Sequence, residues 1–453
     1  MIPCFRAYDI RGIYGSELTD DIAYQVGRCL PQMLGTTEIL VGYDARVSSS
    51  ALRDALIRGL TEAGANVTDM GLATTPMVYF FTAEKGFGGS VMITASHNPP
   101  EYNGLKVSKA GARPCGYHLG LKDVETWIES GALPPVAETK GTVTHADYRA
   151  EYAAWMRQFA GDTTGLNYAV DCSDGAAGVI AGDLFGAAAV LMNATPDGAF
   201  PHHGPNPLEL ENCEQIIAAV RERKLDVGII FDGDADRVMC VDERGEFVPP
   251  DALIPLFATW LRDNFSMEGV DPVVVHDIRA SRGVMEVLGE TGFEPLMVRV
   301  GAAFAKTALR ERNGLCGGEV AGHYYFRHFH WCDSGELAAL FILAIVADAK
   351  RKGKTFSQIL APITGRYARS GEVNVHGVGD RASAVARVEA AVLELMGAPV
   401  NRADFDGVRL DWSDAWFGVR ASNTEPILRL AGEMRSQEKL DELISVAKTV
   451  ALQ

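Results

Sequence analysis

The order of apolar and polar residues repeats three times along the greater part of this chain. In each copy an apolar strand ends in Asp, a few polar or small residues follow, and a segment of helical periodicity leads into a second apolar strand. The copies begin at residues 39–44, 168–171 and 273–277. Strand–helix–strand units of this size are typical of mostly parallel, doubly wound sheets. The pattern therefore predicts three similar α/β domains.

The chain after about residue 366 has a different order of elements. Most of the expected strands follow one another through short turns, without a helix between them. This order is typical of an antiparallel sheet, and we expect a smaller α+β domain here. The expected strands are 371–375, 407–411, 415–420 and 427–431, and the expected helices are 381–396 and a last one from residue 437.

Segments with Pro and Gly mark the seams between these units, near residues 134–135, 249–250 and 362–365. The fold class that we predict is α/β, with three similar doubly wound α/β domains followed by a C-terminal α+β domain. We place the domains at residues 1–142, 143–248, 249–362 and 363–453.

The composition narrows the classes of partner. The 453 residues carry a net charge of −17, and a surface of that sign repels nucleic acid and anionic membranes, so we expect neither as a partner. The most apolar stretch, residues 337–347, is too short to span a bilayer, and we expect it to form a buried helix. No secretory signal is visible, and the eight cysteines include no C-x-x-C pair. These features predict reduced thiols, no zinc framework and a cytoplasmic location.

A serine follows the apolar strand at residues 90–93, in the segment Thr-Ala-Ser-His-Asn-Pro. The Asn-Pro pair favours a turn, so Ser96 is held on a rigid loop where its hydroxyl can act as a nucleophile. His97 can donate to a bound phosphate. Lys106 lies ten residues after Ser96, and the chain can bring it back beside the serine as a cation or a general acid/base. The segment lacks the Gly-x-Ser-x-Gly pattern of α/β-hydrolases. By itself it is also compatible with an ordinary surface loop.

Three carboxylates, Asp232, Asp234 and Asp236, follow the apolar strand at residues 226–231. Packed together without a cation they would repel one another, and a hard divalent ion with oxygen ligands removes that repulsion. An EF-hand does not fit, because Arg237 stands where that loop needs Gly and a strand precedes the motif where a helix should. The spacing therefore predicts a metal site, with Arg237 offsetting the carboxylates or binding a phosphate, and a solvated acidic turn is the less favoured alternative.

Three further segments carry weaker signals. Glycines flank Glu319 and His323, so the backbone there can approach a ligand while the two side chains bind hydroxyl groups, although a plain glycine-rich turn is the alternative. The polar turn from Arg420 to residue 426 offers guanidinium, hydroxyl, amide and backbone donors to a dianionic phosphate, although a polar hairpin turn capped by proline is the alternative. Arg11, near the N-terminus, can add positive charge close to a phosphoryl group.

Together these segments resemble the α-D-phosphohexomutase superfamily, and most closely its phosphomannomutase/phosphoglucomutase branch. The motifs occur in the family's order over essentially the whole chain. The resemblance implies four domains around a central cleft, each contributing one motif. It also implies an intramolecular phosphotransferase that interconverts hexose 6-phosphate and hexose 1-phosphate, of mannose, glucose or both, through a phosphoserine and a hexose 1,6-bisphosphate intermediate and activator. Mg²⁺ is the implied cofactor, sugar phosphates are the implied ligands, and we expect a monomer or homodimer.

The resemblance also implies roles for individual residues. The implied catalytic residues are Ser96, which carries the phosphoryl group, with His97, Lys106 and Arg11 around it. The implied metal ligands are Ser96, Asp232, Asp234 and Asp236. The implied substrate-binding residues are Tyr8, Arg237, Arg279, Glu319, His323, Arg420, Ser422, Asn423 and Thr424.

Two positions depart from the family's pattern. The sugar-reading loop often reads Gly-Glu-Met-Ser, and Ala321 here lacks that last hydroxyl. Many members carry Gly-His at the end of a strand in the third domain, and here Ala302 follows Gly301. Both changes remove a polar group near the sugar, so they bear on substrate choice.

Three alternatives to this function stay open. A phosphoglucosamine mutase or another phosphosugar mutase is disfavoured by Asn423, where that enzyme usually has Gly. A phosphoserine hydrolase would pass the phosphoryl group to water. A sugar-phosphate sensor would have kept the fold and lost turnover, for which the departures at Ala302 and Ala321 provide some support.

Overall fold

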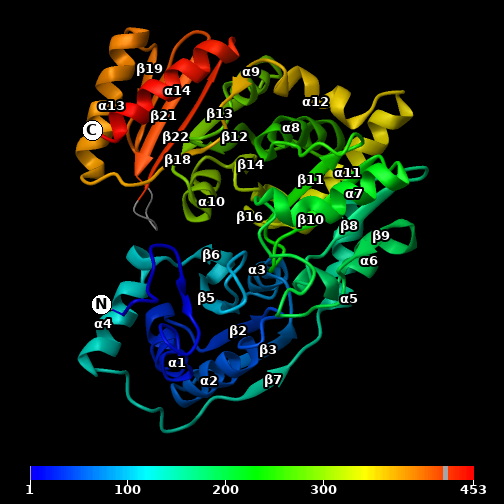
Figure 1. Ribbon diagram of the computed structural model, residues 1–453. Coiled ribbons are helices and arrows are strands. Elements are labelled where there is room, and N and C mark those ends of the chain that lie inside the picture. Colours follow the sequence, from blue (N-terminus) through cyan, green and yellow to red (C-terminus); the bar gives the residue numbers. More distant parts are fainter. Residues whose placement is uncertain (1, 422–426) are drawn as a thin grey trace.

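The computed structural model describes residues 2–421 and 427–453, and it contains four sheets in four successive domains (Figure 1). In the view of Figure 1 the first domain lies at the bottom, the second at the right, the third at the top centre and the fourth, with the C-terminus, at the top left. The predicted fold class is confirmed, since three α/β/α domains precede an antiparallel one.

The first sheet has a parallel core and an antiparallel edge. Its order is β1-β5-β4-β2-β3-β7, with β6 paired to β5, and β1 and β4 both run antiparallel to β5. β7 pairs with β3, so the sheet extends to His145, beyond the boundary expected at residue 142. The strands are β1 (Ile10–Ile13), β2 (Glu38–Tyr43), β3 (Asn66–Leu72), β4 (Gly89–Ile93), β5 (Tyr102–Lys109), β6 (Arg113–Pro114) and β7 (Val143–His145), and the helices are α1 (Asp20–Leu34), α2 (Ser49–Glu62), α3 (Thr75–Glu84) and α4 (Leu121–Ser130).

The second and third sheets repeat this plan, with orders β11-β10-β8-β9 and β13-β12-β14-β15-β16. Parallel strands form the centre of each, and antiparallel strands follow the motif-bearing loops. The second domain contains β8 (Tyr168–Asp171), β9 (Val190–Met192), β10 (Val227–Phe231), β11 (Val238–Asp242), α5 (Arg149–Met156), α6 (Ala181–Phe185) and α7 (Glu214–Arg223). The third contains β12 (Asp271–Asp277), β13 (Glu294–Val298), β14 (Gly314–Gly318), β15 (Tyr324–Phe326), β16 (Cys332–Asp333), α8 (Leu253–Asn264), α9 (Arg282–Glu290), α10 (Ala302–Glu311), α11 (Gly335–Arg351) and α12 (Phe356–Thr364).

The fourth sheet is antiparallel throughout its described pairs, in the order β17-β22-β21-β20-β19 with β18 beside β22. Two helices, α13 and α14, accompany it. The elements are β17 (Ala368–Arg369), β18 (Val373–Val375), β19 (Asn401–Ala403), β20 (Val408–Asp411), β21 (Ala415–Ala421), β22 (Leu428–Met434), α13 (Arg381–Met396) and α14 (Gln437–Ala451).

The apolar core joins the first three domains and leaves the fourth separate. One cluster of buried side chains includes α3 of the first domain, β8 and β10 of the second, and α8 and α11 of the third. Residues 337–347 are buried in α11, as the apolar run predicted, because the helix is enclosed by neighbouring elements. The fourth domain has its own cluster, built only from residues 368–451. Among the helices of the described residues, none combines the length and apolar composition that a membrane crossing requires.

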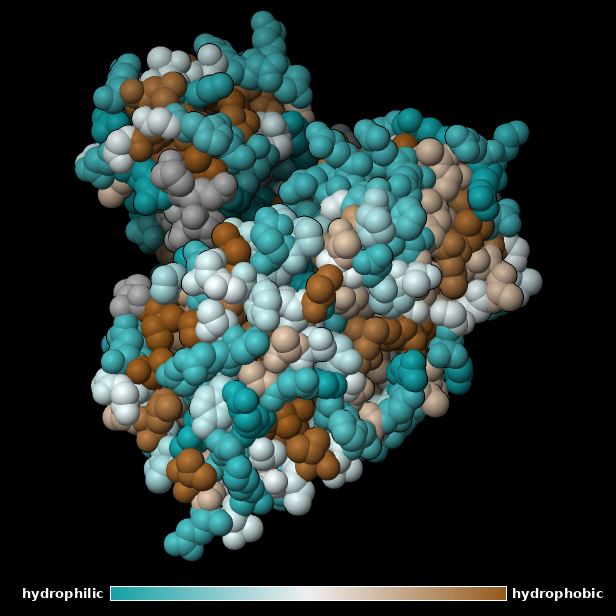
Figure 2. Space-filling model, turned by 60° about the horizontal axis from the view of Figure 1, so that its bottom comes forward, coloured by the Kyte–Doolittle hydropathy of each residue, from teal (hydrophilic) through white to brown (hydrophobic). Residues whose placement is uncertain are grey.

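The fourth domain meets the third through polar contacts. Arg409, on β20, is buried and donates to the carbonyl groups of Ile278 and Ala280, at 2.7 Å each. Glu433, on β22, accepts from Ser281 Oγ at 3.0 Å. Figure 2 shows the fourth domain as a separate lobe at the upper left, with a hollow of mostly hydrophilic surface between it and the rest of the molecule.

Candidate active site

Ser96 lies on the loop after β4, in a left-handed backbone conformation with φ of 54°. Its hydroxyl donates to Oδ2 of Asp232 at 2.9 Å and lies 3.3 Å from Nδ1 of His97. Such a φ costs a non-glycine residue about 1–3 kcal/mol, so the loop around Ser96 must hold it in place. The folded chain thus brings Ser96 against a carboxylate that lies 136 residues further along the sequence.

Asp232, Asp234 and Asp236 are all buried on the loop after β10. The ammonium of Lys106 pairs with Asp234 at 2.6 Å and also with Asp236. Burial and the two neighbouring carboxylates raise the pKa of Asp232 well above its ordinary value. Burial also acts to raise the pKa of Asp236, but Lys106 and His323 outweigh it and hold that pKa well below its ordinary value. The loop is a dense acidic site that one lysine only partly neutralises.

These three carboxylates fit a hard divalent cation. One ligand oxygen from each lies within 4.8 Å of the others. Oδ1 of Asp234 is buried and accepts no hydrogen bond from the part of the chain that the structure describes. A buried carboxylate oxygen without a donor is costly unless it coordinates a cation, and oxygen ligands of this kind are those that Mg²⁺ prefers.

A second group of possible ligands, Asp236, His323 and Asp333, is less suited to a cation. Nζ of Lys306 lies 2.5 Å from Oδ1 of Asp333 and already neutralises it. Nε of Arg237 donates to Nε2 of His323 at 3.2 Å, which occupies the imidazole nitrogen and adds positive charge. The candidate metal site is therefore the trio on the loop after β10.

The basic residues expected near Ser96 gather around its loop. Arg11 donates to Oδ1 of Asn98 at 2.8 Å and pairs with Asp9. Burial, together with two nearby guanidinium groups, holds the pKa of His97 well below its ordinary value, so its imidazole is neutral. A neutral imidazole keeps one N–H, and His97 can therefore still donate a hydrogen bond.

Lys106 reaches the acidic loop from β5, whose neighbour β4 leads to Ser96. Burial alone would lower the pKa of Lys106, but the carboxylates of Asp234 and Asp236 raise it above its ordinary value. The side chain is therefore held as an ammonium, which suits a fixed cation better than a general base.

Glu319 and His323 lie on the turn between β14 and β15. The backbone N–H of Glu319 donates to the carbonyl of His323 at 3.0 Å, and the hydroxyl of Tyr325 donates to the Glu319 carboxylate. Arg279 pairs with Asp277 at 2.7 Å and lies 4.0 Å from Oε2 of Glu319. The Glu319 carboxylate is thus presented in a fixed orientation beside a guanidinium.

The acidic loop and the Glu319 turn are in direct contact. Nε2 of His323 lies 3.5 Å from Oδ1 of Asp236, and Arg237 forms an isolated β-bridge with His323. Arg237 also donates from its backbone N–H to Oδ1 of Asp232 at 3.2 Å. The predicted loops of the first three domains therefore form one continuous site.

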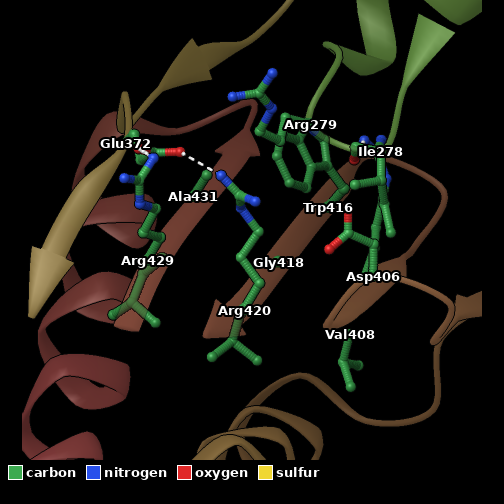
Figure 3. Close-up of a pocket in the computed structure, with 13 residues that line it drawn as sticks. Ile278, Arg279, Glu372, Asp406, Val408, Trp416, Gly418, Arg420, Arg429 and Ala431 are labelled. Atoms are coloured by element: carbon green, nitrogen blue, oxygen red, sulfur yellow. Dashed lines mark hydrogen bonds and ion pairs between the residues drawn. The ribbon is translucent and has the colours of Figure 1, made fainter. Parts of the chain in front are cut away.

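Four guanidinium groups line a small cavity of about 30 Å³ at the junction of the third and fourth domains (Figure 3), those of Arg279, Arg409, Arg420 and Arg429. Arg420 lies 3.6 Å from Oε2 of Glu372, and Arg429 donates to the same carboxylate at 2.8 Å. Burial and the neighbouring Arg279 lower the pKa of Arg420 from its ordinary value. The other expected residues of this phosphate-binding turn lie outside the described residues: Ser422, Asn423 and Thr424.

Tyr8 extends from the first domain to the loop before α10. Its hydroxyl donates to the carbonyl of Val300 at 3.2 Å, and its ring packs edge to face on Phe304. The backbone N–H of Val300 donates to Asp406 of the fourth domain at 2.9 Å. The first, third and fourth domains therefore meet at Val300. This residue lies two positions before Ala302, and Ala302 stands where many members of the family have His.

Sequence reasoning missed several residues that support this site. Tyr325 alternates with apolar neighbours in β15 and is indistinguishable by pattern from a core aromatic. Thr75 begins α3, as many threonines begin helices, yet its hydroxyl donates to Asp234. Lys306 is buried beside Asp333 and lies 3.8 Å from the ring of Tyr79, whereas lysines on helices are usually exposed. Only the structure reveals these partners, because they come from distant segments.

Four family models match successive parts of the chain. They are described as phosphoglucomutase/phosphomannomutase alpha/beta/alpha domain I, domain II and domain III, and the C-terminal domain of the same family. The matched residues are 3–130, 148–245, 249–367 and 378–446, respectively.

Full-length relatives and solved structures resemble the chain over nearly its whole length. It is 35% identical to a phosphomannomutase of Escherichia coli, and the match covers 99% of each chain. It is also 35% identical to a Xanthomonas campestris protein with the name phosphohexose mutases, and that match covers 97% of each chain. The crystal structure of a phosphoglucomutase/phosphomannomutase family protein from Burkholderia thailandensis has a TM-score of 0.88 at 28% identity, covering 99% of this chain and 97% of that one. An Aspergillus fumigatus N-acetylphosphoglucosamine mutase, solved with glucose 1,6-bisphosphate, shares the fold with a TM-score of 0.60 at 15% identity, covering 99% and 95%.

Proposed function

This chain belongs to the phosphoglucomutase/phosphomannomutase family and is a phosphohexomutase of the phosphomannomutase type, and on that premise we propose that Ser96 carries the phosphoryl group it transfers. The observation that carries the proposal is the 2.9 Å contact between Oγ of Ser96 and Asp232. It sets a hydroxyl on a strained loop against one of three buried carboxylates, and burying such charges together is costly without a cation.

Asp232, Asp234 and Asp236, with the Ser96 oxygen, would hold Mg²⁺ in this proposal. The unpartnered Oδ1 of Asp234 and the close spacing of the carboxylates support this assignment. When bound, the ion supplies positive charge to the oxygens of the transferring phosphoryl group.

The proposed reaction moves the phosphoryl group in two reciprocal transfers. First the P–O bond to Oγ of Ser96 breaks and a P–O bond to the free hydroxyl of a hexose phosphate forms, and Oγ of Ser96 gains the proton that this hydroxyl loses. The resulting hexose 1,6-bisphosphate turns around and returns its other phosphoryl group to Ser96. The charged side chains of Lys106 and Arg11 stabilise the developing charge, and His97 contributes a neutral N–H.

Recognition of both orientations needs groups that do not distinguish the two ends of the sugar. A carboxylate such as Glu319 can accept from two neighbouring sugar hydroxyls in either orientation. Its two contacts, with Tyr325 and near Arg279, support a fixed position for this carboxylate. Arg420 would bind the phosphate that is not reacting, together with residues of the adjoining turn.

The fourth domain would close over the substrate about a hinge near Pro362 to Arg366. Its separate apolar core supports motion as a unit, and Pro362 lies in the last turn of α12, where it cannot donate a helical hydrogen bond. We also infer a cytoplasmic location, which the eight free and buried cysteines support.

The phosphoryl assignment is tested by intact-mass analysis of the purified protein. We expect a fraction heavier by one phosphoryl group, absent in Ser96→Ala, and we expect that variant to lose activity even when the hexose 1,6-bisphosphate is supplied. Full activity of Ser96→Ala would overturn the assignment. Release of inorganic phosphate without isomerised sugar phosphate would indicate a hydrolase, and ligand binding without turnover would indicate a sensor.

Substrate choice is tested by coupled assays with mannose 1-phosphate, glucose 1-phosphate and glucosamine 1-phosphate. We propose mannose or glucose phosphate as substrate, which the similarity to phosphomannomutase and phosphohexose mutase relatives supports. A kcat/KM that is highest for glucosamine 1-phosphate would favour phosphoglucosamine mutase instead.

A further inference from the structure

Arg46 has a buried guanidinium, and four of its five N–H donors point at one segment, residues 96–102. Its side chain has no exposed surface, and its Nε donates to Oδ2 of Asp44 at 3.1 Å. The remaining N–H groups donate to four backbone carbonyls, three on the Ser96 loop and one at the first residue of β5. These carbonyls belong to Ser96 at 2.8 Å, Asn98 at 2.6 Å, Pro99 at 2.6 Å and Tyr102 at 3.0 Å. A guanidinium has five N–H donors, and each is used here.

The loop depends on these bonds because it has little regular structure of its own. Ser96 has a φ of 54°, a conformation that must be imposed by its surroundings. The loop runs from the end of β4 to the start of β5 at Tyr102, so the carbonyl groups of Ser96, Asn98 and Pro99 lie outside both strands. A buried carbonyl without a donor is costly, and Arg46 supplies a donor to the buried carbonyl of Ser96 while it also binds the carbonyls of Asn98 and Pro99 further along the loop.

The second domain packs against the same arrangement. The ring of Phe200 lies 5.2 Å from the Arg46 guanidinium. A Cβ added at Gly233, between the proposed metal ligands Asp232 and Asp234, would lie only 2.6 Å from the carbonyl oxygen of Ser96. The carbonyl of Ser96, which Arg46 binds, is therefore also the group that the acidic loop approaches most closely at Gly233.

We propose that Arg46 is a positioning residue that sets the distance between the Ser96 hydroxyl and the acidic loop. This inference rests on the proposed role of Ser96 as the phosphoryl carrier. Arg46 acts through the backbone of the Ser96 loop and touches no reacting group. Its planar, five-donor fork is essential to this role, because a lysine has a single ammonium and cannot bind four spaced carbonyls together.

The test compares Arg46→Lys with a matched variant, Arg28→Lys. Arg28 is also a buried arginine of the first domain, and it donates to the carbonyl of Pro134 and to the hydroxyl of Tyr24, away from the Ser96 loop. We expect Arg46→Lys to lower kcat by about a hundredfold, the effect of misplacing a reacting group by about 1 Å, with KM for mannose 1-phosphate nearly unchanged. Arg28→Lys should keep its kcat, even if its Tm falls by as much as the Tm of Arg46→Lys. An Arg46→Lys enzyme with wild-type kcat would overturn the proposal.

Asp44→Asn provides a second test if Arg46→Lys does not fold. Oδ1 of Asp44 accepts from Ser49, and an asparagine can keep that bond, but its NH₂ group cannot accept from Nε of Arg46. We expect a lower kcat and faster amide hydrogen exchange confined to residues 96–103. Unchanged kcat and unchanged exchange in this segment would overturn the proposal.

The two proposals fail in different ways. If Ser96 is not the phosphoryl carrier, Ser96→Ala keeps its activity and the wild-type protein carries no phosphoryl group there. If only the positioning role is wrong, Ser96→Ala is inactive while Arg46→Lys turns over like the wild type.

Discussion

Replacement of Glu336 by Gln should remove a pH-dependent loss of stability. Glu336 lies in the first turn of α11, is completely buried and accepts a hydrogen bond from the hydroxyl of Tyr152. Burial raises its pKa from 4.5 to about 7, although the Tyr152 hydroxyl opposes part of that rise. The carboxyl is therefore neutral in the folded protein under mildly acidic conditions and becomes a buried anion above neutrality.

The size of the effect follows from the difference between the folded and unfolded pKa values. The folded state holds this proton more tightly, so the stabilisation is full below pH 4.5 and is lost as the pH rises through about 7. Over the whole range the loss amounts to about 3 kcal/mol, and about 2 kcal/mol of it falls between pH 5.5 and pH 8. Glutamine does not titrate, so any cost of its amide group is the same at every pH.

Thermal unfolding of the wild type and of Glu336→Gln at pH 5.5 and pH 8 measures this difference. We expect the variant to gain Tm relative to the wild type as the pH rises. Glu222→Gln, on the exposed surface of α7, is the control and should follow the wild type at both pH values. A Tm difference between Glu336→Gln and wild type that stays constant from pH 5.5 to pH 8 would refute the reasoning.

Three other substitutions test the site itself. Asp234→Asn should lower kcat by about a hundredfold and raise the Mg²⁺ concentration needed for half-maximal activity, and a chelator should abolish wild-type activity; full activity in chelator would contradict the metal assignment. Tyr325→Phe should raise KM for mannose 1-phosphate by about tenfold, because the Glu319 carboxylate loses a hydrogen bond and a bond to a charged group contributes about 1.5–3 kcal/mol. An unchanged KM would show that Glu319 does not need the Tyr325 hydroxyl to bind the sugar. Lys106→Met should lower kcat far more than Lys106→Arg if the residue acts as a fixed cation, and equal losses in single-turnover assays would instead indicate proton transfer by Lys106.

Local pattern was sufficient to predict most of the elements and the main loops. In the fourth domain the expected helix at residues 381–396 coincides with α13, and the last helix begins at Gln437 as expected. Asp380 and Ser436, which cap these helices, are residue types that favour helix starts. The loops that carry Ser96 and the three aspartates were found for a similar reason, because each follows an apolar strand with residues that have no use in a core, whereas the Glu319 segment was marked only by its flanking glycines.

Contacts between distant segments could not be predicted in this way. β7 is short and exposed, and only its pairing with β3 assigns it to the first sheet. Arg46 follows a strand like many surface arginines, and nothing near it in sequence indicates that its partners lie 50 to 56 residues away. Tyr325 was missed for a different reason. It lies between two buried aromatic residues, so the sequence makes it look like an ordinary residue of the apolar core. In each case the partner is specified by the fold rather than by adjacent residues.

The division of the apolar core gives the site two parts with different freedom. Ser96, the acidic loop and the Glu319 turn all belong to domains that share one buried cluster, so their mutual distances are set by close packing. Arg420 belongs to a domain with a separate core, joined to the rest by polar contacts such as those of Arg409 and Glu433. Phosphoryl transfer needs the first kind of precision, whereas a bisphosphate that turns around needs a wall that can open and close again. The placement of the reacting groups in the rigid part and of Arg420 in the separable part meets both requirements within one chain.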